Sequence, residues 1–562
     1  MKYSEFAELY ESLFATSKRL EKTDILSLFL KKLERRSRPE WIYLLRGKTI
    51  PDYDSREFGI SIQLSVKALN AAWGISSDNV LKRYRIIGDI GKITQEFAQQ
   101  RIQKSLFSQP LEVKKVFDTL NKILDIEGKG AVERKLGLIA ELLNSASPLE
   151  SKYIIRTLLN DLRVGVAESL ILDSITKSFF PDEMRDKVYD AYYLTNDFSA
   201  VFSAAMKGEK AIDKIEIVPG RPIHVMLPIK VISIDEAFRI CGKPAAFEHK
   251  YDGFRMVIHK KGDDIKLFTR RLENVTKQFP DVVDAIKTFV KGNSFILDSE
   301  VVGYDLKDKK YKPFEAISQR IKRKHNIEKL IHELPVEINV FDVLYYNGES
   351  WMSRTFSERR NLLVKIVKPK QFVIQPSYFF ITGDEKKAMA FYKNALKTGE
   401  EGVMIKKLDA PYRPGRRVGY ITKMKPIVKD LDLVIVGAEY GTGKRAGWLT
   451  SYVLACKKNE QFLEVGMASS GLKEKAEEGT TYEEITGLLK SLIISTDGTR
   501  VLVKPKLVVS VTYQNIQPSP SYSSGFALRF PRISHYRPDR SVQDIATLSD
   551  VRNAVKTAPL KD

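Results

Sequence analysis

The residues best suited to chemistry form the segment EHKYDGFR, which begins at Glu248. Side chains alternate along a strand, so Glu248 and Lys250 are expected on one face, before a tight turn at Asp252-Gly253 and a second strand starting near Arg255. A lysine is a nucleophile only when its pKa falls. A cation about 4 Å away disfavours the protonated lysine by roughly 4 kcal/mol at an effective dielectric constant of about 20. Because about 1.4 kcal/mol equals one pKa unit, a few such neighbours could bring the pKa of a lysine near neutrality. The segment predicts covalent catalysis by Lys250, with a hairpin of solvated charges as the alternative.

Further chemically capable residues follow downstream, most of them inside or beside apolar runs. They are Arg270 in TRR, Glu300 in DSE, Phe341 in FD, Glu401 and Lys406 in EGVMIK, and Lys423 and Lys425 in KMK. An acid in an apolar strand is costly to bury unless it meets a cation or a metal ion. Taken singly, Glu300 also fits a structural ion pair, Phe341 a core position, and the two lysines solvated charges at a strand edge. The order of the whole set favours one shared site.

The chain carries a large positive charge. Its 562 residues include 92 Lys and Arg against 71 Asp and Glu, a formal charge of +21, and the sequence pI is near 9.5. A surplus of this size favours a polyanionic partner, above all nucleic acid, over a generally basic solvated surface. Hydrophobic residues make up 43% of the chain, which is enough for several cores and excludes disordered, collagen-like and coiled-coil classes.

The N-terminal part of the chain has the apolar spacing of helices. A capping box is predicted from Ser147 to Glu150, and the helix that it starts is expected to carry Leu162 and to end near Gly165. The Pro/Gly cluster at 218–222 predicts a linker, because such clusters interrupt regular structure.

Beyond the linker, short β-rich runs alternate with helical stretches. Strands are expected at Ala246–Lys250, Phe254–His259, Ile265–Phe268, Phe295–Val302, Glu337–Leu344, Phe372–Ile374 and Val403–Lys406, and helices at Asp281–Val290 and Asp384–Thr398. A third stretch predicts strands at Leu431–Val436, Ser451–Ala455, Phe462–Val465 and Leu507–Tyr513, then a helical tail after Arg540. The chain is therefore expected to be multidomain, with an all-α domain at 1–217, an α+β domain with a mainly antiparallel sheet at 218–426, and a small β-barrel at 427–562.

Several other kinds of site and segment are excluded. Two distant cysteines, Cys241 and Cys456, allow neither a disulfide framework nor a Cys-rich zinc site, and they fit a reducing, intracellular setting. The GTGK stretch from Gly441 is interpreted as a turn and not a phosphate loop, because Arg445 stands where Ser or Thr should follow. No targeting peptide or membrane span is expected, since the N-terminus carries acids and no apolar run approaches 18 residues.

The ordered motifs KYDGFR, TRR, DSE, FD, EGVMIK and KMKP resemble the nucleotidyltransferase motifs of ATP-dependent DNA ligases. The resemblance extends from the helical region to FALRFPR, which starts at Phe526, and so covers nearly the whole chain. The three-part layout is most similar to the archaeal, replicative-type DNA ligases, which are similar to eukaryotic DNA ligase I. This resemblance implies a helical DNA-binding domain, an adenylation (nucleotidyltransferase) domain and a C-terminal OB-fold domain.

The resemblance also implies a role for each motif residue. Lys250 would attack the α-phosphate of ATP and form a lysyl-AMP, from which AMP passes to the 5′-phosphate of a nick before the 3′-hydroxyl displaces it. Around ATP, Glu248 would contact the adenine side, Phe341 would stack on adenine, Arg255 and Arg270 would contact ribose or phosphate, Glu300 would contact ribose, and Arg417, Lys423 and Lys425 would meet phosphates. Mg²⁺ would be held by Glu300 and Glu401. Arg416 competes with Arg417, and the spacing to Lys423 favours Arg417.

The chain departs from the family pattern in places, and the resemblance also names partners. Ser299 stands where Gly is common, Ile421 where Trp is frequent, and Arg540 where Lys is common, which bears on the role of the barrel in the first step. The expected partner is nicked double-stranded DNA in replication, recombination and repair, with a sliding clamp as a further candidate and no membrane. A monomeric, cytoplasmic, nucleoid-associated enzyme is expected. The alternatives are an RNA ligase, an mRNA-capping guanylyltransferase and a non-catalytic nucleic-acid-binding protein.

Overall fold

The computed structural model describes residues 1–36, 38–100, 109–307, 309–312, 314–323, 327–426, 430–441, 445, 447–474 and 479–557. The chain divides into two compact units. Met1–Met389 with Val403–Met424 form the first unit, and Ala390–Gly402 with Lys425–Asp562 form the second. The first unit therefore holds the helical region and the strands of the middle region. The domain boundaries after residues 217 and 426 stay predictions.

Helices fill the N-terminal region, as expected. They are α1 (Ser4–Ala15), α2 (Arg19–Glu34), η1 (Pro39–Arg46), α3 (Ile62–Trp73), α4 (Ser77–Ile87), α5 (Ile90–Gln99), α6 (Val113–Asp125), α7 (Ala131–Ser145), α8 (Pro148–Leu158), α9 (Glu168–Phe179), η2 (Asp182–Met184), α10 (Arg185–Thr195), α11 (Phe198–Ala205) and α12 (Glu209–Asp213). Apolar spacing gives each amphipathic helix one apolar face, and these faces meet in one core around Phe6, Tyr10 and Ile154.

Helix α8 confirms one prediction and corrects another. The Ser147 hydroxyl accepts a hydrogen bond from the Glu150 N–H, and the Glu150 carboxylate accepts one from the Ser147 N–H, which is the predicted capping box. The helix ends at Leu158, however, and does not extend to Gly165. Asn160 has a φ of 52°, in the left-handed region that terminates helices. The expected helix was therefore too long, because apolar spacing continued past the residue that turns the chain.

The middle region contains two β-sheets, where a single sheet was expected. One sheet has the strand order β1-β11-β10-β2-β9, and the other has the order β4-β3-β5-β6-β7, with β8 beside β6. The strands are β1 (Ile229–Val231), β2 (Ala245–His249), β3 (Phe254–Lys261), β4 (Asp264–Thr269), β5 (Ser294–Gly303), β6 (Val336–Tyr346), β7 (Glu349–Ser350), β8 (Ile374–Pro376), β9 (Phe379–Thr382), β10 (Val403–Lys406) and β11 (Ile421–Met424). Among the described strands, only β1–β11 and β6–β8 pair in parallel, which confirms a mainly antiparallel region.

Helices cover one face of each sheet. The helices of the middle region are α13 (Ile234–Cys241), α14 (Pro280–Phe289), α15 (Phe314–Lys322), α16 (Ile327–Glu333), α17 (Phe356–Ile366) and α18 (Glu385–Lys397). On the first sheet, the ring of Phe238 from α13 lies 5.7 Å from the ring of Phe247 on β2. On the second sheet, Ile286 from α14 and Leu363 from α17 share a core with Met256 from β3. Because side chains alternate along a strand, the catalytic candidates lie on the opposite faces.

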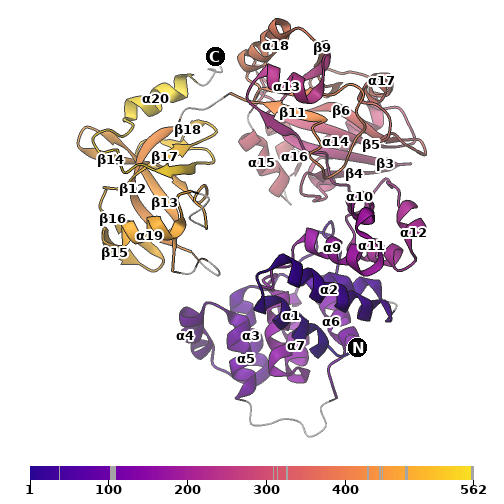
Figure 1. Cartoon of the computed structure of the whole chain (residues 1–562), viewed down its shortest axis with the longest axis vertical. Helices are drawn as coiled ribbons and strands as arrows, with labels where there is room; N and C mark the ends of the chain where they lie inside the picture. The colour runs from indigo at the N-terminus through magenta and orange to yellow at the C-terminus, as the bar shows by residue number, and fades with distance from the viewer. Residues whose placement is uncertain are drawn as a thin grey trace. The chain divides into compact units, whose positions relative to one another are not determined.

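The C-terminal region is rich in strands and ends in a helix (Figure 1). Its elements are β12 (Leu431–Tyr440), β13 (Leu449–Lys458), β14 (Gln461–Ala468), α19 (Tyr482–Lys490), β15 (Ile493–Asp497), β16 (Arg500–Val503), β17 (Val508–Thr512), β18 (Ile516–Pro518), β19 (Phe526–Leu528), β20 (Arg532–Tyr536) and α20 (Leu548–Thr557). Strand β12 pairs with β13 on one side and with β16 and β17 on the other. Helix α20 confirms the helical tail. The predicted turn at 441–444 lies outside the described residues beyond Gly441.

The predicted fold class is confirmed in its three parts: a helical N-terminal region, an α+β middle region and a β-rich C-terminal region. In the described part of the chain, none of the helices combines the length and the apolar character that crossing a membrane requires.

Candidate active site

The first sheet presents an acid and two lysines on one face. Glu248 on β2 pairs with Met404 on β10, and Met404 pairs with Lys423 on β11. Residues opposite each other on neighbouring strands point to the same face, so Glu248 and Lys423 flank Met404 there. Lys406 lies two residues beyond Met404 and shares this face. The structure thus brings together residues of the segments EHKYDGFR, EGVMIK and KMKP.

Glu248 is buried and held by cations and a hydroxyl. Its Oε2 lies 2.6 Å from the Nζ of Lys406, and its Oε1 accepts a hydrogen bond of 3.2 Å from the hydroxyl of Ser377. The guanidinium of Arg360 lies 4.0 Å from Oε1. The Lys406 ammonium also lies 4.7 Å from the centroid of the Phe341 ring. Lys406 therefore connects the acid of the first sheet to the aromatic residue of the second.

The second sheet carries a row of polar residues across its strands. Arg255 on β3 pairs with Glu300 on β5, Glu300 pairs with Asn339 on β6, and Asn339 pairs with Gln375 on β8. Gln375 Nε2 donates a 3.2 Å hydrogen bond to Asn339 Oδ1. Arg255 and Glu300 therefore share a face, as their roles in one site require.

Phe341 occupies a β-bulge of strand β6. Asp298 pairs with Asp342 and Ser299 with Val340, so Phe341 is the extra residue between two pairs. A bulge of this kind redirects side chains, and here it leaves Asp342 opposite Asp298 while Phe341 stays half-buried. Because the strand is irregular there, the two residues of the FD motif differ in their surroundings: Asp342 is paired across the sheet, whereas Phe341 is the extra residue of the bulge.

Lys250 directly follows β2 and is half-buried. The turn after it packs tightly on the second sheet, because a Cβ on Gly253 would lie 2.4 Å from the backbone oxygen of Val301 and 3.1 Å from Cγ of Glu300. Only glycine tolerates this approach. The Asp-Gly turn thus places the segment that carries Lys250 next to the strand that carries Glu300.

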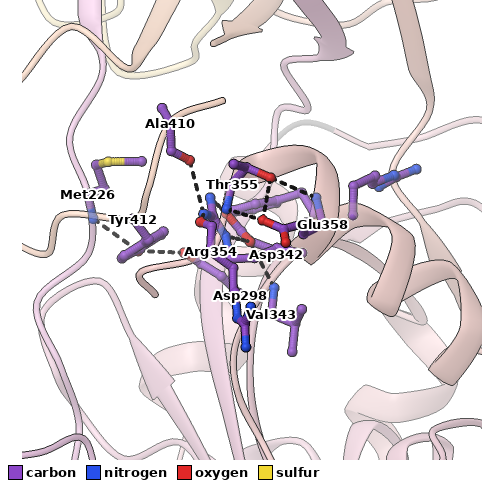
Figure 2. A network of polar contacts seen from close by, with 12 residues as sticks. Met226, Asp298, Asp342, Val343, Arg354, Thr355, Glu358, Ala410 and Tyr412 are labelled. Atoms are coloured by element: carbon purple, nitrogen blue, oxygen red, sulfur yellow. Dashed lines mark hydrogen bonds and ion pairs between the residues drawn. The ribbon is translucent and has the colours of Figure 1, made fainter. Parts of the chain in front are cut away.

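Arg255 is fixed by its contacts with the buried Asp298. Figure 2 labels Asp298 and its neighbour Tyr412. Arg255 Nε donates to Asp298 Oδ1 at 2.8 Å, and Nη2 donates to Oδ2. Nη1 donates to the Met226 carbonyl at 3.0 Å, and Nη2 also donates to the Tyr412 hydroxyl at 3.1 Å. Burial alone would lower the pKa of Arg255, but the Asp298 carboxylate raises it above its usual value. Asp298 lies two residues before Glu300, and that alternation is the signal that could have identified it.

A second buried cluster lies beside the first. Arg359 on α17 donates to both carboxylate oxygens of Asp342 at 2.7 and 3.1 Å, and to the carbonyls of Arg354 and Ala410 at 2.6 and 3.2 Å. Asp342 also accepts a 2.9 Å hydrogen bond from the Val343 N–H. Figure 2 labels Asp342, Val343, Arg354 and Ala410 of this cluster. The sequence carries no signal for this pair, since Arg359 lies in an ordinary amphipathic helix.

The two arginines of the GRR stretch have different surroundings. Arg416 Nε lies 2.9 Å from Asp190 Oδ1, and its Nη1 lies 3.0 Å from Asp186 Oδ1. Arg417 is exposed. The acids thus occupy Arg416, and the assignment of Arg417 to a phosphate stays a prediction. Arg270 is exposed at the end of the edge strand β4.

In the second compact unit, Lys425 and Gln514 hold Glu401. Lys425 Nζ lies 2.6 Å from Glu401 Oε2, and Gln514 Nε2 donates to Glu401 Oε1 at 2.9 Å. Among the described residues, no cluster of three or more His, Cys, Asp or Glu side chains could hold a metal ion. Mg²⁺ commonly binds through one or two carboxylates together with substrate phosphates, and single carboxylates such as Glu300 and Glu401 fit that mode.

Three family models match the chain in order. They are the DNA ligase N terminus at residues 2–176, the ATP dependent DNA ligase domain at 225–425 and the ATP dependent DNA ligase C terminal region at 445–540. Similar curated proteins include the DNA ligase of Nanoarchaeum equitans, 45% identical over 98% of each chain. The DNA ligase of Thermococcus onnurineus is 40% identical over 98% of this chain and 97% of its own.

A solved structure supports the fold over nearly the full length. The structure titled Pmar-Lig_PreS3 superposes with a TM-score of 0.58 at 18% identity, and the match covers 94% of this chain and 99% of the other. The agreement includes the helical, middle and C-terminal regions, so the arrangement of elements along the chain is shared.

Proposed function

The chain belongs to the ATP-dependent DNA ligases, and we propose that it seals nicks in double-stranded DNA through an adenylate bound covalently to Lys250. Enzymes of this family use ATP and a divalent metal ion. The observation that carries the proposal is the Gly253 turn, which packs the chain next to Lys250 against the strand of Glu300. The membership also favours a DNA ligase over an RNA ligase, a capping enzyme or a non-catalytic binding protein.

The reaction divides one difficult bond formation into three displacements. First, the uncharged Nζ of Lys250 attacks the α-phosphorus of ATP, the bond to the β-phosphate oxygen breaks, and pyrophosphate leaves while the amine proton is lost to solvent. Second, a 5′-phosphate oxygen at the nick attacks the same phosphorus, and the lysine nitrogen takes up a proton from solvent and leaves as the amine. Third, the 3′-hydroxyl attacks the 5′-phosphate, its proton is released, and AMP leaves.

The proposed nucleotide contacts follow the two sheet faces. Glu248, fixed by Lys406 and Ser377, contacts the adenine side of the nucleotide. Phe341 stacks on the base, which suits a half-buried ring. On the same sheet, Arg255 and Glu300 contact ribose or phosphate, and the exposed Arg270 adds a further cation. Arg417, Lys423 and Lys425 meet phosphates, because their cations lie before, within and directly after strand β11.

Mg²⁺, held by Glu300, Glu401 and phosphate oxygens, would neutralise phosphate charge. The Glu401 carboxylate already contacts one positive charge, the Lys425 ammonium, and is therefore oriented toward a cation.

Nicked DNA is the substrate that membership of this family implies. The charge of +21 supports a grip on the phosphate backbone, and we assign most of this grip to the helical region. A general ligase should recognise backbone and shape, so no base specificity is expected. A sliding-clamp partner, a monomeric state and an intracellular, nucleoid-associated location belong to this proposal.

The decisive experiment follows the covalent adenylate. The enzyme is incubated with ATP labelled at the α-phosphate and Mg²⁺, and the label on the protein is measured with and without nicked duplex. We expect labelled wild type, loss of the label on adding nicked DNA, and no label on Lys250→Ala. Lys243→Ala is the matched control, because Lys243 is an exposed lysine whose surface ion pair joins Glu385. Label on Lys250→Ala, or on a different residue, would refute the proposal.

A further inference from the structure

Among the described residues, four of the five N–H groups of Arg255 have a hydrogen-bond acceptor. Of the five N–H groups of an arginine, Nε and one Nη2 hydrogen bind the Asp298 carboxylate. The other Nη2 hydrogen points to the Tyr412 hydroxyl, and one Nη1 hydrogen points to the Met226 carbonyl. The side chain is 15% exposed, and the second Nη1 hydrogen has no partner among the described contacts. The orientation of this last donor depends on the other four contacts.

The Tyr412 hydroxyl completes this arrangement. It donates to Asp298 Oδ2 at 2.9 Å, and it accepts hydrogen bonds from Arg255 Nη2 at 3.1 Å and from the Met226 N–H at 3.0 Å. Figure 2 shows Tyr412 between Met226 and Asp298. Burial, and then the charge of Asp298, raise the pKa of Tyr412 well above its usual value, so the hydroxyl stays a donor. One oxygen therefore contacts the arginine, its counter-charge and the segment before β1.

The backbone that carries Tyr412 is itself held in place. The Tyr412 N–H donates to the Met352 carbonyl at 2.8 Å, and two residues earlier the Ala410 carbonyl accepts a hydrogen bond of 3.2 Å from Arg359. The Arg359 guanidinium also lies 5.8 Å from the centroid of the Tyr412 ring. A hydroxyl on a ring that is fixed in this way is a rigid anchor for Arg255.

We propose that Tyr412 is a positioning residue for adenylate formation, which holds Arg255 so that its remaining N–H meets the ribose or phosphate of ATP. This inference rests on the proposed function. Without the hydroxyl, Asp298 loses a donor and the Met226 N–H loses its acceptor, so the guanidinium is less restrained. Arg255 also lies 5.4 Å from the centroid of the Phe341 ring, and a displaced guanidinium would disturb that ring too. Misplacement of a substrate contact slows the reaction even when the fold persists.

The first test compares two buried tyrosines that each lose one hydroxyl. Tyr412→Phe is expected to lower kcat/KM for adenylate formation by about tenfold or more. Tyr10→Phe is the matched control, because Tyr10 is fully buried in the helical region and donates to the Leu44 carbonyl at 2.7 Å. Both variants should unfold at similarly lowered temperatures, while only Tyr412→Phe loses adenylate formation. A Tyr412→Phe enzyme with wild-type kcat and KM would overturn the inference.

A double-mutant cycle separates positioning from general damage. Arg255→Lys keeps the charge but cannot form the same planar fork. If Tyr412 acts through Arg255, the double variant loses no more activity than Arg255→Lys alone. Losses that multiply would contradict the inference. If Tyr412→Phe fails to fold, Asp298→Asn replaces it in the cycle, because Asp298 is the other anchor of the guanidinium.

The outcomes also distinguish this inference from the proposed function. Wild type that takes up no label from ATP would refute the proposed function itself. Wild type that is labelled, together with a Tyr412→Phe variant labelled at the same rate, would refute only the positioning role. One labelling experiment therefore tests both hypotheses: the wild-type sample tests the proposed function, and the Tyr412→Phe sample tests the positioning role.

Discussion

Two arginine–aspartate pairs in the middle region look alike locally but differ in their access to the site. Arg255 binds Asp298 through two nitrogens, and Arg359 binds Asp342 in the same way. Each guanidinium also donates to at least one backbone carbonyl. The side chain of Arg255 is 15% exposed, however, whereas that of Arg359 is 1% exposed. The difference therefore lies in what remains accessible and not in the geometry of the pair.

This difference separates the arginine that we propose to contact the nucleotide from one that is enclosed in the fold. A buried ion pair is weak evidence for stability, because desolvation offsets most of the attraction. The Arg359–Asp342 pair instead fixes geometry: it holds the residue after Phe341 and the chain at Ala410. The Arg255–Asp298 pair fixes geometry as well, but it leaves one donor for a ligand. Removing either partner should thus affect stability in one case and catalysis in the other.

The largest expected effect comes from breaking the structural pair. Asp342→Ala should lower the free energy of unfolding by about 3–5 kcal/mol, because it leaves the Arg359 charge buried and unpaired. Urea denaturation followed by circular dichroism measures this change. Replacing both partners with apolar residues of similar size should restore part of the loss.

The control for this prediction is a pair on the surface. Asp264 lies 3.5 Å from Lys266, with side chains 63% and 41% exposed. Asp264→Ala should therefore change the free energy of unfolding by less than about 1 kcal/mol. Equal losses in Asp342→Ala and Asp264→Ala would show that burial does not distinguish the two kinds of pair.

Much of the fold and part of the site can be predicted from sequence, because both depend on local patterns. The apolar run around Asp298 and Glu300 predicts strand β5, and alternation places both acids on one face. The capping box before α8 predicts the start of that helix for the same local reason. The roles of Lys250 and the motif residues come from the family resemblance, and these roles stay predictions.

Contacts between distant residues could not be predicted. Tyr412 meets Asp298 across 114 positions of sequence, and no local pattern connects two such residues. The bulge at Phe341 is equally hidden, because it depends on how β6 pairs with β5. The division of the strands into two sheets has the same cause, since β2 pairs with β10 rather than with β3.

An intermediate effect is expected when each arginine is replaced by lysine. Arg255→Lys should slow adenylate formation about tenfold, equivalent to about 1.4 kcal/mol, with a small loss of stability. Arg359→Lys should lose more stability, because the three N–H donors of a lysine cannot satisfy both carboxylate oxygens of Asp342 and two backbone carbonyls together. The specific activity of its folded molecules should stay closer to that of wild type. Rates from labelled ATP and melting temperatures measure the two effects. If both variants lose the same fraction of the adenylation rate and the same amount of stability, the distinction between Arg255 and Arg359 is wrong.

The smallest effect concerns His259, which lies on the same strand face as Arg255 but has no acid partner among the described contacts. Burial, and then the charge of Lys266, lower the pKa of His259 to about 3. Its Nδ1 accepts a hydrogen bond from the Gly220 N–H at 3.1 Å, which requires the neutral ring. The unfolded chain, with a pKa near 6.5, binds the proton first, so stability is lost as pH falls from about 6.5 toward 3.

Between pH 7 and pH 6 this loss should be less than about 1 kcal/mol. His259→Asn retains an acceptor for Gly220 but does not titrate. The free energy of unfolding of wild type should therefore fall more steeply over this interval than that of His259→Asn. Parallel slopes for the two proteins would mean that a buried group on this face can take up a proton without a carboxylate beside it. In that case, a carboxylate partner such as Asp298 would not be what decides whether a buried side chain on this face of the strand carries a charge. The contrast between Arg255 and His259 would then need another cause.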